Sequence, residues 1–259
     1  MRTSAPLALA AALAAIIASS TVRISHAAAT PAASAPAAAA PASSAPAAAA
    51  ATAAAATTAS SATSATKGGS AEAGAAKAGT CLACHGANGN SSADIWPSLA
   101  GQNASYVLAQ LKLWHDNKRL DSTNLMPSQA ATLSEQDMED LAAYYASQVP
   151  EGHEADPSYW QAGQKLYRGG DRSRNIPACM ACHGPVGRGN PAAGFPALRA
   201  QHAVYTVKQL TDYGNDTRYV IDAKGASEGG ANSEIMRTIA KRLSAEDIRN
   251  LASYIQGMR

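Results

Sequence analysis

The stretch Cys81-Leu-Ala-Cys84-His85-Gly86 recurs 98 residues later as Cys179-Met-Ala-Cys182-His183-Gly184. In each copy two thiols lie about one helical turn apart, and a histidine directly follows the second thiol. This is the attachment pattern of c-type haem, in which the cysteines bond to one porphyrin edge and the histidine lies beneath the iron. We therefore expect two covalently bound haem c groups. The expected attachment residues and iron ligands are Cys81, Cys84, His85, Cys179, Cys182 and His183.

Three other uses of paired cysteines compete with this interpretation. A zinc ribbon separates its two Cys-x-x-Cys pairs by about 15–20 residues, whereas 94 residues lie between Cys84 and Cys179. A thioredoxin-type pair needs a βαβ setting, and no such pattern surrounds either motif. Disulfide bonds are common in exported proteins, but they do not explain a histidine at the same place twice.

The repeat extends well beyond the cysteine motifs. Trp96-Pro97-Ser98-Leu99 matches Phe195-Pro196-Ala197-Leu198 at an offset of 99, and Leu141–Tyr144 matches Leu251–Tyr254 at an offset of 110. The second copy therefore carries about eleven extra residues, which we place near 218–230. A period near 100 residues indicates a duplicated domain rather than a solenoid. We expect domains at 71–150 and 156–259, separated by a segment rich in Pro, Gly and charge.

Each copy is expected to be helical, because no segment alternates in the manner of a strand. Ser134 and Ser244 precede acidic residues and are good helix N-caps. The expected helices are 73–84, 104–117, 134–148, 158–168, 203–213 and 244–257. The predicted fold class is all-α, with two tandem domains. Domains this small bury little surface on their own, and a large internal cofactor would compensate.

The second axial ligand of each iron is expected to be a methionine. Met126 lies seven residues before Leu133, and Met236 lies seven residues before the matching Leu243. A lone methionine is more often a core residue, but equivalence across the repeat favours the ligand role. The histidines at 115, 153 and 202 have no counterpart in the other copy, so we expect surface or hydrogen-bonding roles for them. Histidine–methionine ligation leaves no open iron position and raises the potential, which favours electron transfer over catalysis.

Other residues are candidates for contacts around the haem. The carbonyl groups of Pro97 and Pro196 are placed to accept the N–H of the proximal imidazole and so to orient it. Trp96 and Phe195 are candidates for packing on the haem edge. Residues that could reach the haem propionates are Gln102, Gln201 and Arg199. Ordinary packing or surface positions remain the alternative for each of them.

The N-terminal quarter differs in composition from the rest. Residues 1–27 have an early arginine, a short apolar stretch and small residues, as expected of a cleaved export signal; an uncleaved N-terminal anchor is the alternative. The apolar stretch is shorter than the ~20 residues of a membrane helix. Residues 28–70 are rich in Ala, Ser, Thr and Pro, and we expect a disordered linker because there is almost nothing to bury. Export predicts a periplasmic location.

Charge is divided unevenly between the two copies. The formal net charge of the chain is +2, which gives no sign of nucleic-acid binding. Residues 68–155 carry four basic and ten acidic residues, a formal −6, whereas residues 156–259 carry fourteen basic and nine acidic residues, a formal +5. The hypothesis is that the two halves dock different partners, because charge sets the approach of electron-transfer proteins. Solvated faces without a role are the alternative.

The sequence strongly resembles the dihaem cytochrome c4 family over about residues 72–259. The matching stretches include CMACHGPVGRGNPAAGFPAL at 179–198, IMRTIAKRLS at 235–244, and SLAGQ at 98–102. The resemblance implies two class I cytochrome c domains packed about a pseudo-twofold axis, and a periplasmic carrier of a kind that is often loosely associated with the membrane. It also implies electron flow from a quinol-oxidising cytochrome bc complex to a haem–copper terminal oxidase. The Ala/Pro/Ser linker and the extra residues near 218–230 depart from the family pattern, and the linker suggests a tether or a spacer.

Two other functions share these features. Cytochrome subunits of sulfide dehydrogenases and other small-molecule dehydrogenases resemble the same family, so a fixed electron-transfer subunit is the first alternative. A dihaem peroxidase is the second, and it needs a haem with a vacant or displaceable ligand. We expect an electron carrier rather than an enzyme.

Overall fold

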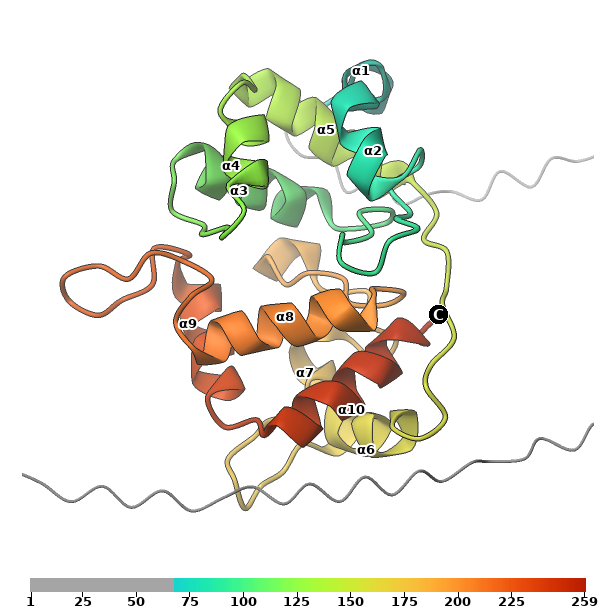
Figure 1. The fold of residues 1–259 in the computed structure, drawn as a ribbon, viewed down its shortest axis with the longest axis vertical. Coiled ribbons are helices and arrows are strands. Elements are labelled where there is room, and N and C mark those ends of the chain that lie inside the picture. The colour runs from blue at the N-terminus through green and yellow to red at the C-terminus, as the bar shows by residue number, and fades with distance from the viewer. Residues whose placement is uncertain (1–67) are drawn as a thin grey trace, which may run out of the picture. The chain divides into compact units, whose positions relative to one another are not determined.

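The computed structural model describes residues 68–259 (Figure 1). The expected export signal at 1–27 lies outside the described residues, as does nearly all of the expected linker at 28–70. Within the described part, none of the helices combines the length and the apolar composition that a bilayer-spanning segment needs.

The described chain forms two groups of helices, which Figure 1 shows one above the other, joined by the segment 148–159 along one side. Between residues 68 and 259 the only β-structure consists of isolated bridges, which confirms the all-α prediction. The first group contains α1 (Ala71–Lys77), η1 (Ala78–Cys81), α2 (Leu82–His85), α3 (Ala104–His115), α4 (Leu125–Ala130) and α5 (Glu135–Ser147). The second group contains α6 (Trp160–Gly169), α7 (Met180–His183), η2 (Pro191–Ala193), α8 (Ala203–Gly214), α9 (Ala231–Ala240) and α10 (Ala245–Gln256).

The last helix of each group begins at the predicted serine. The hydroxyl groups of Ser134 and Ser244 accept the backbone N–H of Asp137 and Asp247, and those carboxylates accept the serine N–H in return. This reciprocal capping box satisfies two otherwise unpaired donors at each helix start. The same local chemistry therefore sets the start of α5 and of α10.

The segments that carry Met126 and Met236 are helical, although the sequence predicted no helix between 117 and 134 or between 213 and 244. Met126 lies on α4 and Met236 on α9. The extra residues of the second group lengthen the segment before its helix to 215–230, against 116–124 in the first group, and lengthen the helix itself. The insertion therefore lies directly before Met236.

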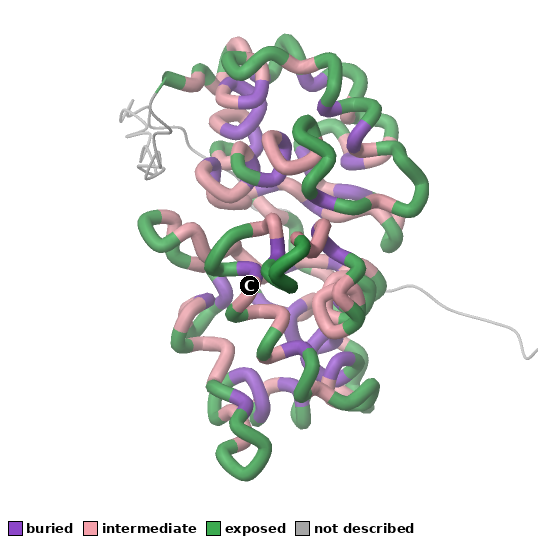
Figure 2. The backbone as a smooth tube through the Cα atoms, turned by 90° about the vertical axis from the view of Figure 1, so that its left-hand side faces the viewer, coloured by how far each residue is buried: buried purple, intermediate pink, exposed green. Residues whose placement is uncertain are grey.

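Each group is built on a close crossing of its first and last long helices, α1 with α5 and α6 with α10. A Cβ atom on Gly74 would lie 2.1 Å from the backbone oxygen of Asp140, and one on Gly163 would lie 1.9 Å from that of Asn250. Only glycine permits this approach. Around each crossing lies a separate cluster of buried apolar side chains, and Figure 2 shows the buried segments inside both groups.

The two groups hold one another through reciprocal hydrogen bonds. The Gln102 amide accepts from Ala197 N and donates to Ala197 O, both at 2.8 Å. The Gln201 amide makes the equivalent pair with Ser98, at 3.0 and 2.9 Å. Since Gln102 and Gln201 occupy matching positions of the repeat, the contacts are related by an approximate twofold axis.

We predict that Gly163→Ala destabilises the second group by about 1–3 kcal/mol or more, because the methyl group overlaps the α10 backbone. Urea unfolding followed by far-UV circular dichroism measures the change. Gly169→Ala is the matched control on the same helix, because a Cβ there meets nothing within 4 Å. Equal stability of the two variants would contradict the close-crossing account.

Candidate haem sites

Each cysteine motif forms a short helix that ends at its histidine. In the first group, Cys81 ends η1 and Cys84 lies on α2, which ends at His85. In the second, Cys179 precedes α7, which runs from Met180 to His183. The helical turn brings the two thiols of each pair to the same side, as attachment to one porphyrin edge requires.

All four cysteines are free of disulfide bonds, and burial raises the pKa of the Cys179 thiol to about 11. Within residues 68–259 no group of three or more histidine, cysteine, aspartate or glutamate side chains is arranged to hold a metal ion. The two cysteine pairs therefore do not come together as the four ligands of one zinc ion would.

Both motif histidines are buried and oriented by a backbone carbonyl. His85 is 6% exposed and His183 is 5% exposed. The Nδ1 atom of His85 lies 2.8 Å from Pro97 O, and that of His183 lies 2.9 Å from Pro196 O. A carbonyl oxygen only accepts, so the proton is on Nδ1 and the lone pair is on Nε2. Burial lowers the pKa of both imidazoles, against a smaller opposing effect of the carbonyl, which keeps Nε2 free for a metal.

Met126 and Met236 occupy equivalent places in the two groups. Met126 is half-buried and packs against the apolar cluster of the first group. Met236 is also half-buried, on α9, which packs against α8. The structure thus offers one half-buried thioether in each group, on an element separate from the cysteine motif.

The remaining predicted residues have varied surroundings. The ring of Phe195 lies beside His183, with 6.2 Å between centroids. Trp96 is half-buried, and its backbone N–H donates to Ala93 O. Gln102 and Gln201, predicted as contacts of the haem propionates, use their amides on the backbone of the opposite group; the propionate contacts stay a prediction. Arg199 has a buried Nε with no hydrogen-bond partner among the described residues, and burial lowers its pKa.

The other described histidines have partners of their own. His202 Nε2 lies 2.8 Å from Ser91 O, and its ring lies against that of His153, with 4.2 Å between centroids and the planes tilted by 32°. His115 Nδ1 lies 3.0 Å from a carboxylate oxygen of Asp116. His202 and His115 therefore have polar partners, whereas the ring of His153 contacts that of His202. Surface or hydrogen-bonding roles for the three stay a prediction.

Two buried arginines that were not predicted from the sequence lie between the groups. Arg119 is 5% exposed and Arg218 is 3% exposed. Arg119 donates to Gln110, Tyr205 and Gln209. Arg218 donates through Nη2 to Tyr106, while its Nε and Nη1 have no partner among the described residues. The internal repeat could have identified them, because Arg119 and Arg218 are related by the same offset of 99 residues.

This pair provides a test of whether the chain fits haem. Among residues 68–259 neither guanidinium takes part in an ion pair. The Arg218 guanidinium lies over the rings of Tyr213 and Tyr219, 4.7 and 5.2 Å from their centroids, but its Nε and Nη1 donors stay without a hydrogen-bond acceptor in this part of the chain. A buried charge is costly unless it is paired, so these donors would suit an anion. Haem carries propionate carboxylates, which suit such donors. The thiols, the oriented imidazoles and the cationic interior therefore fit the group.

Comparisons with known proteins agree with this chemistry. The chain matches the Cytochrome c family model at residues 71–148 and 160–259. It is 45% identical over 180 residues to cytochrome c4 of Pseudomonas aeruginosa, covering 69% of this chain and 83% of the relative. It resembles the crystal structure of reduced recombinant cytochrome c4 from Pseudomonas stutzeri with a TM-score of 0.67 and 43% identity, covering 74% of this chain and 100% of that one.

A relative with a different description is also similar. The thiosulfate dehydrogenase electron acceptor of Thiomonas intermedia is 33% identical over 182 residues, covering 68% of this chain and 77% of the relative. The chain is thus also similar to a protein whose description is electron acceptor of a dehydrogenase.

We predict that Gln201→Ala lowers the free energy of unfolding by about 1–3 kcal/mol, because it leaves the Ser98 N–H and carbonyl unpaired between the groups. Urea unfolding measures the loss. Gln129→Ala is the control, because that side chain is exposed and makes no hydrogen bond among the described residues. If the two variants are equally stable, the glutamine contacts do not hold the groups together.

Proposed function

Since this chain belongs to the cytochrome c family, in its dihaem cytochrome c4 group, we propose that it carries single electrons in the periplasm from a quinol-oxidising cytochrome bc complex to a haem–copper terminal oxidase. Its family makes it a dihaem electron-transfer protein with two haem c groups at the Cys81/Cys84 and Cys179/Cys182 motifs. The location and the two partners are the proposal. The haem supplies a one-electron redox couple, and the chain's residues determine its ligands and surroundings.

His85 and His183 are the proximal iron ligands in this proposal. The observation that supports it best is the hydrogen bond from each Nδ1 to a proline carbonyl. That bond selects one tautomer, leaves Nε2 as the ligating atom, and makes the imidazole a stronger donor. The burial that lowers each histidine pKa keeps the ring neutral, which a ligand must be.

Met126 and Met236 are the distal ligands. Each lies on the helix that precedes the capping box of its group, at matching distances. A thioether raises the reduction potential relative to a second imidazole. Ligands from both sides leave no position for a substrate, so the chain is a carrier and not an oxidase or peroxidase.

The uneven charge supports separate docking faces. The first group carries a formal −6 over residues 68–155, and the second a formal +5 over residues 156–259. Encounters between electron-transfer proteins are small and brief, and complementary charge guides their approach. In the proposal the acidic half meets one redox partner and the basic half meets the other.

A second candidate function is electron acceptor of a small-molecule dehydrogenase. The similarity to a thiosulfate dehydrogenase electron acceptor favours it. Stable co-purification with a catalytic dehydrogenase subunit from the native source would support this candidate, and recovery of the chain alone would support the mobile carrier. In both, the haem ligands are the same.

We predict that Met126→Ala and Met236→Ala each remove the sulfur-to-iron charge-transfer absorption of one ferric haem and leave that of the other. The absorption requires a thioether bound to iron, so its amplitude counts the intact ligands. Met138→Ala is the control, because Met138 is a buried core residue. Full absorption in both ligand variants would contradict the assignment. Peroxide turnover by the unaltered protein would favour a peroxidase.

We predict that added salt slows electron exchange with both the donor and the acceptor protein, by about tenfold or more between low ionic strength and ~0.2 M. Stopped-flow reduction and oxidation kinetics measure the two rates. An uncharged small-molecule reductant serves as control, because its encounter needs no charge guidance. Rates that do not change with salt for either protein would contradict the two docking faces.

A further inference from the structure

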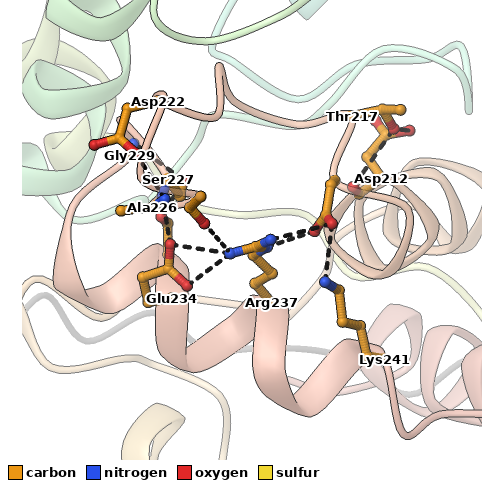
Figure 3. A network of polar contacts seen from close by, with 12 residues as sticks. Asp212, Thr217, Asp222, Ala226, Ser227, Gly229, Glu234, Arg237 and Lys241 are labelled. Carbon is orange, nitrogen blue, oxygen red and sulfur yellow. Dashed lines mark hydrogen bonds and ion pairs between the residues drawn. The ribbon is translucent and has the colours of Figure 1, made fainter.

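The residue after Met236 makes an unusually complete set of contacts. Arg237 lies on α9, and its side chain is 19% exposed. Its guanidinium donates through Nε and Nη2 to the carboxylate of Asp216, the second contact at 3.2 Å. Its Nη1 donates to Gly225 O at 2.9 Å. The same atom donates to Glu234 Oε2 at 3.1 Å (Figure 3). Every nitrogen of this guanidinium is therefore engaged.

These acceptors come from three different segments. Asp216 lies just past the end of α8, Gly225 in the inserted loop, and Glu234 in the first turn of α9. Glu234 in turn accepts the backbone N–H of Ser227, and Lys241 adds a 2.8 Å contact to Asp216. Arg237 thus ties its own helix to α8 and to the loop that leads into it.

The centre of this network is a strained and charged position. Asp216 has φ 60, in the left-handed region that non-glycine residues seldom adopt. The hydrogen bond from Arg237 is the main cause that lowers the pKa of Asp216 to about 2, so the carboxylate stays ionised. A charge-assisted, two-pronged contact holds planar groups in a defined orientation.

The first group has no such network. The repeat offsets place Asn117 opposite Asp216, Asn124 opposite Glu234, and Pro127 opposite Arg237. Asn117 shares the left-handed backbone, with φ 55, but it has no carboxylate. There the Asp121 carboxylate accepts the N–H of Met126 itself, at 3.0 Å. The two methionines are therefore held by different means.

We propose that Arg237 is the positioning residue for Met236, holding α9 against α8 and the inserted loop so that the thioether stays within reach of the second haem. The inference rests on the proposed ligand role of Met236. The longer loop of the second group needs the contacts of Arg237, which we call the brace, because a longer segment loses more conformational freedom when it is ordered. In the first group the shorter loop and Asp121 perform the same task.

Two variants remove the brace from opposite ends. Asp216→Asn copies the residue of the first group and suits the left-handed backbone, so the fold is retained. Arg237→Gln removes the guanidinium. In the ferric holoprotein we expect each variant to lower the sulfur-to-iron absorption of one haem and to strengthen imidazole binding at one haem by about tenfold, since a loosened thioether is displaced more easily. Potentiometry should show one haem potential falling and the other unchanged.

Three further variants complete the experiment. Arg172→Gln makes the same charge change as Arg237→Gln at an exposed arginine whose side chain makes no hydrogen bond or ion pair among the described residues, and it should leave both haems unaltered. Asp121→Asn should affect the other haem. Arg237→Lys should lower the absorption and the potential less than Arg237→Gln does, because lysine keeps the positive charge but lacks the planar, two-pronged guanidinium.

Met236→Ala, measured in parallel, distinguishes a failure of the proposed ligand role of Met236 from a failure of the positioning role of Arg237. If Met236→Ala leaves both absorption bands intact, the ligand assignment itself is wrong. If it removes one band while Asp216→Asn and Arg237→Gln match Arg172→Gln in absorption, imidazole affinity and potentials, the ligand assignment stands and the positioning role is overturned.

Discussion

The hydrogen bond from a buried imidazole to a proline carbonyl sets the chemistry of each site. His85 with Pro97, and His183 with Pro196, place the proton on Nδ1 and direct Nε2 to the proposed iron. Burial alone would leave the tautomer open. The cysteines of each motif would hold one edge of the porphyrin, and the imidazole and the proposed methionine ligand would then bind the iron.

The two copies of the repeat share their main structural features but differ around the methionines and in charge. The capping boxes, the glycine crossings and the reciprocal glutamines occur in both groups at matching positions. The surroundings of the methionines differ, with a single carboxylate before α4 and a network of ion pairs around α9. The charges of the two halves also differ. In the proposed carrier, these differences would let the two similar sites meet different redox partners.

Much of the architecture could be predicted from local signals. The serine caps, five of the six expected helices and the repeat follow from short-range patterns, and the proline carbonyls follow from matching positions. The expected helix 73–84 is instead divided into α1, η1 and α2, and α9 was not expected. The helix around Met126 was missed because Pro127 disfavours helical backbone in the residue before it, although proline is tolerated in a first turn. The partners of Gln102 and Gln201 lie 95 and 103 residues away, so no local pattern could show them. The buried arginines could have been found, since they obey the repeat.

The central claim is that each chain holds two haems, both with one nitrogen and one sulfur ligand. Near-infrared magnetic circular dichroism of the oxidised holoprotein tests it most directly, because the energy of the charge-transfer band identifies the ligand pair of each low-spin haem. The account predicts that the histidine–methionine band has the intensity of two haems per chain and that no high-spin signal is present. A bis-histidine band, or a high-spin haem in the untreated protein, would contradict it.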